Sequence, residues 1–103
     1  MRKPGDLITK DPTADEPVGF DWSGWLTDLG MGNIIVTSTW TIAGPDAVLT
    51  SHDPTIITGA VKTQVYLAAG TPGKRYEVTN RILTNSAPPV TDERSFKVLV
   101  QNR

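Results

Sequence analysis

The last third of the chain alternates large apolar and polar side chains with the period of a β-strand. Residues 76–84 read Tyr-Glu-Val-Thr-Asn-Arg-Ile-Leu-Thr, and residues 95–100, after a loop, read Ser-Phe-Lys-Val-Leu-Val. Successive side chains of a strand point to opposite faces, so each segment can bury one face and expose the other. The two segments therefore predict a pair of strands at the edge of a β-sandwich. Neither carries a catalytic motif.

Residues 33–42 predict the clearest strand of the remaining chain. Ile34, Val36, Trp40 and Ile42 fall on one face, while isoleucine and threonine occupy the other. β-Branched residues on both faces are typical of a central strand. We expect Trp40 to be the core tryptophan of the sandwich.

Shorter strands are expected between these segments, at residues 47–50, 55–58 and 62–69. The segment Ser51-His52-Asp53-Pro54 predicts a turn, in which the proline biases residue 53 toward an extended backbone. Short strands with turn signals at roughly 8–12-residue spacing are the pattern of an all-β sandwich. The predicted fold is an immunoglobulin-like antiparallel β-sandwich of about seven strands.

The alternation also predicts which side chains point inward. The run Gly-x-x-Tyr-x-Val ending at residue 78 is typical of the strand that carries a corner tyrosine in such sandwiches. In this register Asn80 is buried and needs partners for its amide, and Arg81 projects outward within reach of Glu93. The predicted core residues are Trp40, Tyr76, Val78, Ile82, Phe96 and Val98.

The N-terminal segment differs from the rest in composition. Residues 1–16 combine prolines, a glycine and mixed charges, with Leu7 and Ile8 as their main apolar pair. They predict a flexible arm, which is either disordered or ordered by docking on a neighbour. Residues 17–103 are expected to form the sandwich domain.

Aromatic residues crowd the start of that domain. Phe20 and Trp22 are two positions apart, as on one face of a strand, and Trp25 follows where a turn or short helix is expected. Such a cluster fits either core packing at one end of the sandwich or an aromatic anchor at an interface, where tryptophan is enriched. The candidate interface residues are Leu7, Ile8, Phe20, Trp22 and Trp25.

Composition narrows the class of protein. A chain of 103 residues is one domain, and without cysteine it has no disulfide framework, thiolate metal site or thiol chemistry. We expect neither a secretory signal nor a membrane span, because no long apolar run is present.

Charge is segregated along the chain although the net charge is −1. Residues 11–61 hold seven acidic residues and no lysine or arginine, whereas residues 62–103 hold seven basic and three acidic residues. In one interpretation, the electrostatic fields of the two halves largely cancel within one sandwich. In the other, opposite faces carry charge of opposite sign, so that neighbouring copies pair through unlike surfaces.

Motifs that would carry chemistry are incomplete. Residues 70–75 resemble a phosphate loop but lack its first glycine and its Ser/Thr. His52 is the single histidine and is expected to be a solvated turn residue. We expect no catalytic residue, no metal, no cofactor and no nucleic-acid partner, and therefore no enzyme.

Several pieces of the chain, taken together, resemble small structural proteins encoded near the tail-fibre genes of bacteriophages and prophages, the fibre–tail adaptor-like family. The pieces are Lys10-Asp11-Pro12, Gly19-Phe20-Asp21-Trp22-Ser23, Ser38-Thr39-Trp40, Gly70-Thr71-Pro72-Gly73, Tyr76-Glu77-Val78-Thr79-Asn80-Arg81-Ile82 and Asp92-Glu93-Arg94-Ser95-Phe96. The fifth and sixth are the most specific. The chain departs from the family pattern at residues 85–90, where a Pro-Pro loop stands in place of the expected tight glycine hairpin.

This resemblance implies a non-enzymatic virion structural protein in the tail region, assembled in the bacterial host cytoplasm. Its partners would be other virion proteins of the tail or fibre, together with further copies of itself in a symmetric homo-oligomer. One alternative is a capsid decoration or head–tail joining protein. Another is a carbohydrate- or cell-surface-binding module, for which Tyr66 is the candidate platform residue.

Overall fold

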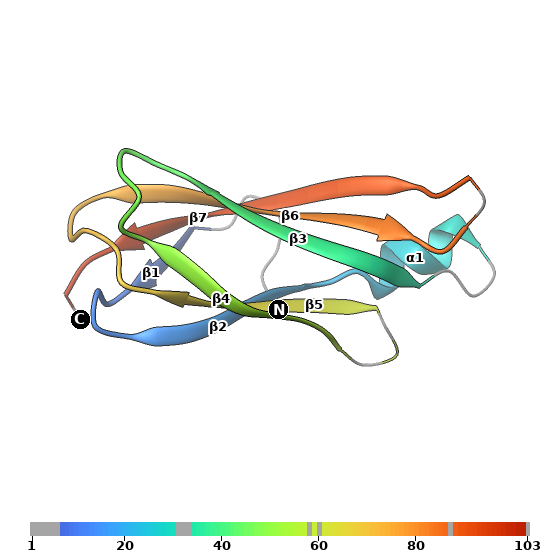
Figure 1. Cartoon of the computed structure of the whole chain (residues 1–103), viewed down its shortest axis with the longest axis horizontal. Helices are drawn as coiled ribbons and strands as arrows, with labels where there is room; N and C mark the ends of the chain where they lie inside the picture. Colours follow the sequence, from blue (N-terminus) through green and yellow to red (C-terminus); the bar gives the residue numbers. More distant parts are fainter. Residues whose placement is uncertain (1–6, 31–33, 58, 60, 87, 103) are drawn as a thin grey trace.

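The computed structural model describes residues 7–30, 34–57, 59, 61–86 and 88–102, which form two facing β-sheets and one short helix (Figure 1). In chain order the elements are β1 (Leu7–Lys10), β2 (Asp15–Asp21), α1 (Ser23–Leu29), β3 (Ile35–Ala43), β4 (Thr50–Ile57), β5 (Lys62–Ala68), β6 (Arg75–Thr84) and β7 (Thr91–Val100). One sheet has the order β1-β7-β6-β3 and the other β2-β5-β4. The helix lies at one end of the sandwich.

The strand order is that of an immunoglobulin sandwich. β7, β6 and β3 correspond to strands G, F and C, and β2, β5 and β4 correspond to strands B, E and D. These neighbours pair antiparallel. β1 pairs with β7 in parallel instead, from Leu7 opposite Lys97 to Lys10 opposite Val100. The prediction of an all-β sandwich of about seven strands is confirmed.

The structure corrects the prediction that the N-terminal segment is a flexible arm. Residues 7–10 form β1 and residues 15–16 begin β2, so the expected boundary after residue 16 falls inside a strand. Ile8 is buried, and the fully buried Lys10 donates from Nζ to the carbonyl oxygens of Asp11 and Ala69. These contacts fix the segment to its own sandwich. The remainder of the predicted arm, residues 1–6, lies outside the described residues.

The structure also corrects the prediction that β6 and β7 lie at the edge of the sandwich. They pair along almost their whole length, as expected, but they occupy the middle of their sheet, with β1 and β3 on either side. β3, predicted as central, is an edge strand. Its threonines lie on the exposed outer face. β-Branched side chains favour a strand even where no neighbour buries them, so their presence on both faces did not require a central strand.

A β-bulge also changes which residues of β3 face the core. The register against β6 shifts between Ile35 and Thr37. Because one extra residue inverts the alternation, Ile35 points inward whereas Ile34 and Val36 are 39% and 53% exposed. The sequence prediction that Ile34 and Val36 share the inner face with Trp40 was therefore wrong.

β4 joins two predicted strands and the turn between them. It runs continuously from Thr50 to Ile57, with a register shift against β5 between His52 and Thr55. Asp53 has a φ of +53°, so it is left-handed rather than extended as predicted. Asp tolerates this conformation better than most residues, and it absorbs the irregularity next to Pro54.

The core lies between the two sheets. Five of the six predicted core residues, those of β6 and β7, are buried. Among the residues that the structure describes, the buried apolar side chains are Ile8, Val18, Phe20, Trp22, Leu26, Ile35, Leu49, Val65, Leu67, Tyr76, Val78, Ile82, Phe96, Val98 and Val100. Trp22 rather than Trp40 is the fully buried tryptophan.

Tyr76 forms the predicted corner. Its hydroxyl accepts a hydrogen bond from the backbone N–H of Thr71 at 3.0 Å and donates one to Oδ1 of Asp46 at 2.6 Å. Its ring lies against Gly44, where an added Cβ would approach the ring to 2.4 Å. The corner therefore ties the β5–β6 and β3–β4 connections together at one end of the sandwich.

Candidate functional site

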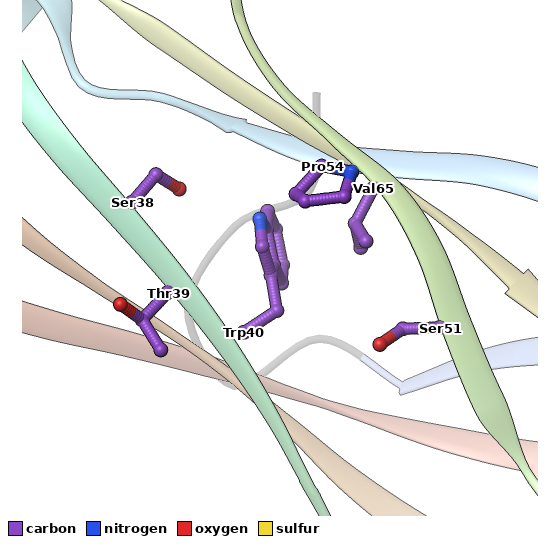
Figure 2. A pocket seen from close by; sticks show the side chains of 6 residues that line it. All are labelled: Ser38, Thr39, Trp40, Ser51, Pro54 and Val65. Carbon is purple, nitrogen blue, oxygen red and sulfur yellow. The ribbon is translucent and has the colours of Figure 1, made fainter.

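A cleft opens between the edge strands of the two sheets. It has a volume of about 320 Å³ and lies between β3 and β4. Figure 2 shows the Trp40 indole standing in the gap between the two strands. The described residues that line it, none of which is charged, are Ser38, Thr39, Trp40, Ser51, Pro54 and Val65.

Trp40 is only half-buried, contrary to its predicted place in the centre of the core. Its ring stacks on Phe20, with centroids 6.0 Å apart and 9° between the planes. The Nε1 atom is buried and has no hydrogen-bond partner within the described part of the chain. Because the indole N–H can only donate, it needs an acceptor from outside these residues.

A buried polar network supports the base of the cleft. Asn80, which is fully buried, accepts hydrogen bonds at Oδ1 from Trp22 Nε1 at 3.1 Å and Thr63 Oγ1 at 2.6 Å. Its Nδ2 donates to Ser38 Oγ at 2.8 Å and to the Thr39 carbonyl at 3.3 Å. The amide is satisfied at both ends, as the sequence required. The network joins the two sheets and orients Ser38 at the cleft.

The predicted interface cluster is corrected by the structure. Phe20 and Trp22 are completely buried, with 0% of their surface accessible to solvent, and Ile8 is 8% accessible. The Arg94 guanidinium also covers the Trp22 ring at 4.1 Å. These side chains pack the core because β1 and β2 turn them inward. They therefore cannot serve as surface anchors.

Two members of that cluster remain accessible. Leu7 is 50% exposed at the start of β1. Trp25, on α1, is half-buried and packs edge-on against Trp22 at 5.4 Å. Their role at an interface stays a prediction.

A second polar group lies on the outer face of the three-stranded sheet. His52 in β4 contacts Asp15 of β2 through Nε2 at 2.8 Å and Asp53 through Nδ1 at 2.9 Å, and its ring stacks on Tyr66 of β5 at 5.4 Å. The hydrogen bonds to Asp53 and then to Asp15 raise the pKa of His52 above its ordinary value of 6.5. The sequence prediction of a merely solvated histidine missed this group, because Asp15 lies 37 residues away.

This group is not arranged to hold a metal ion. The two carboxylates contact opposite nitrogens of the imidazole, so they do not converge on one point. Across the residues that the structure describes, no set of three or more His, Cys, Asp or Glu side chains could hold a metal. No described helix is both long and apolar enough to cross a membrane.

The segregated charge of the sequence maps onto the two sheets. The strands β2, β5 and β4 carry four acidic residues and one lysine, whereas β1, β7, β6 and β3 carry five basic and three acidic residues. One ion pair, from Arg81 to Glu93 at 3.3 Å, lies on the outer face of β6 and β7 as predicted. The strands of the two sheets therefore carry net charges of opposite sign, although Lys10 among the basic residues is buried.

Comparison with known families indicates which class of protein carries these surfaces. Residues 10–99 match the model of the Gp77 family, described as the podophage GP4 fiber-tail adaptor protein gp77. The chain belongs to this family. A search of curated proteins finds no match. Family membership gives this chain a structural role in a phage tail, in contact with other tail or fibre components.

The family match covers the sandwich from the end of β1 to Leu99 in β7. It includes the cleft, the Asn80 network and the His52 group, and it agrees with the resemblance carried by the segments around Trp40 and Arg81. Sequence reasoning identified Trp40 but assigned it to the core. The cleft beside it was missed because β3 and β4 meet only through the packing of the two sheets.

Proposed function

We propose that this protein is a non-enzymatic attachment component of a phage tail, which holds fibre and tail proteins together through protein–protein contacts. The family match over residues 10–99 carries this proposal. The rigid sandwich supports it, because a scaffold fixed by the Asn80 network and the Tyr76 corner can present its edges and faces without changing shape. The protein assembles in the host cytoplasm in several symmetric copies.

The accessible surfaces suit such a role. The uncharged cleft at Trp40 and the two faces of opposite sign offer different contacts on different sides of one small domain. A standard interface buries about 800 Å² on each partner, which is a large share of a total accessible surface of 5610 Å². Two such contacts would cover somewhat less than a third of that surface.

Deletion of the gene from the phage tests this function. We expect particles with filled heads and tails that lack fibres, and we expect a plasmid copy to restore the fibres. Electron microscopy of negatively stained particles gives the fibre count, and antibody labelling gives the position of the protein. Normal fibres on the deletion particles, or label on the capsid surface, would contradict the proposal.

A further inference from the structure

Three of the four edge strands in the described sheets carry features that discourage pairing with another chain. Natural proteins protect such edges with charge, proline, irregular backbone or short length. β2 contains Asp15, Glu16 and Pro17, and β4 is interrupted at Asp53 and Pro54. β1 is only four residues long.

β3 is different from the other three. It has nine residues, without a charged residue or a proline, and most of them are β-branched. Its one irregularity, between Ile35 and Thr37, lies near its start. From residue 37 to residue 43 it pairs regularly with β6, and no other described strand pairs with its second edge. A regular open edge is a template for a further strand.

The cleft next to this edge holds an unpartnered donor. Trp40 Nε1 is buried within the described residues without an acceptor, although buried indole N–H groups usually have a partner. The cleft is large enough for one or two side chains at about 320 Å³, and the described residues that line it are neutral. An unused donor and an open strand edge therefore occur at the same place.

We propose that β3 accepts an extended, uncharged segment of a tail or fibre protein as a fifth strand of its sheet. The segment pairs with the β3 backbone, places apolar or hydroxyl side chains in the cleft and supplies an oxygen acceptor to Trp40 Nε1. A second copy of β3 fits less well, because its own Trp40 adds a second indole N–H that needs an acceptor in the same cleft. The identity of the partner as a virion protein rests on the proposed function.

Cryo-electron microscopy of the assembled tail tests this inference directly. We expect backbone density for an added strand along residues 37–43, at the spacing of about 4.8 Å between neighbouring strands. A protein located in the tail with its β3 edge bare would overturn the inference and leave the proposed function intact. Absence of the protein from the tail would overturn both.

Two matched variants test it in solution and in the particle. Thr39→Lys combined with Thr41→Lys adds two charges to β3, and Thr50→Lys combined with Thr55→Lys adds the same two charges to β4. All four threonines are exposed. In phage lacking the wild-type gene, we expect the β3 variant to enter particles about tenfold less than wild type, and the β4 variant to enter normally. Equal incorporation of both would overturn the inference.

A third variant separates strand addition from a general loss of fold. Trp40→Phe keeps an aromatic ring against Phe20 and removes the donor. We expect its thermal midpoint to stay close to that of wild type while its incorporation falls. Unchanged incorporation would overturn the role of Trp40. A purified chain that forms a dimer lost on the β3 lysine substitutions would instead identify a second copy as the occupant.

Discussion

At the scale of single residues, Asn80 links the most parts of the molecule. Its amide contacts Trp22 from the end of β2, Thr63 from β5 and Ser38 from β3. All these bonds lie in or beside the core, where an unpaired polar group costs far more than in water. The register of both sheets is therefore tied to one side chain.

Replacement of Asn80 by alanine should lower the free energy of unfolding by about 2–4 kcal/mol. The change leaves the partners at Trp22 and Thr63 with fewer bonds and opens a cavity. Urea denaturation monitored by tryptophan fluorescence measures the effect. Thr79→Ala is the control, because the Thr79 hydroxyl bonds to Ser95 on the outer face of the sheet and its loss should cost about 1 kcal/mol or less. Similar losses for the two variants would contradict the role given to Asn80.

At the scale of elements, the His52 contacts join strands that do not pair with each other. β4 and β2 flank β5 on opposite sides, and His52 bridges them over the Tyr66 ring through its bond to Asp15. The bond to Asp53 meanwhile braces the irregular part of β4. The imidazole therefore stabilises the sheet where its strand pairing is interrupted.

This bridge should make stability depend on pH. The folded pKa of His52 is raised above its unfolded value of 6.5 by the bonds to Asp53 and Asp15. The stabilisation is therefore complete below the unfolded pKa and is lost as the pH rises through the folded pKa. We expect the difference in urea midpoint between wild type and His52→Gln to be largest at mildly acidic pH and to vanish at alkaline pH.

His52 is the only histidine, so its titration can be followed by NMR without assignment of other imidazoles. We expect a pKa above 6.5 in wild type and a return toward that value in Asp15→Asn. A folded pKa below 6.5, or a midpoint difference that does not change with pH, would contradict this account.

The elements also show what local sequence can and cannot specify. The alternation in residues 76–84 placed Tyr76, Asn80 and Arg81 on their observed faces, because side-chain direction in a regular strand depends only on parity. It did not reveal that β3 lies at an edge, since this depends on which distant strands pair. It also missed the bulge after Ile35, which inverts parity without a proline or glycine as a signal.

The candidate site was harder to predict for the same reason. Trp40 was recognised from its alternation, but its cleft depends on how closely β3 and β4 approach across the two sheets. Phe20 is buried against Trp40 and Phe96, and Trp22 lies beneath Arg94, so their burial depends on residues 20 to 76 positions away. Contacts at such separations leave no periodic trace in the sequence.

At the scale of the whole molecule, the strands of the two sheets carry net charges of opposite sign although the net charge of the chain is −1. Unlike faces attract when copies stack head to tail, and this arrangement leads to rings or filaments rather than two-fold dimers. A symmetric collar in a tail requires contacts of this heterologous kind.

Self-association through these faces should weaken as salt is added. The screening length falls from about 10 Å at 0.1 M to about 3 Å at 1 M salt, so attraction between exposed charges is lost. Sedimentation velocity across this range measures the effect. Arg81→Glu combined with Lys97→Glu should reduce association at low salt, because both side chains are exposed on the basic face. Association that does not respond to salt would exclude this mode of pairing.

The parallel pairing of β1 with β7 has a mechanical consequence. A force that pulls Leu7 and Val100 apart acts along both strands in opposite directions, because the two strands run the same way. The interstrand hydrogen bonds are then sheared together instead of being opened one after another from an end. A domain whose first and last strands are joined in this way resists tension best along the line between them.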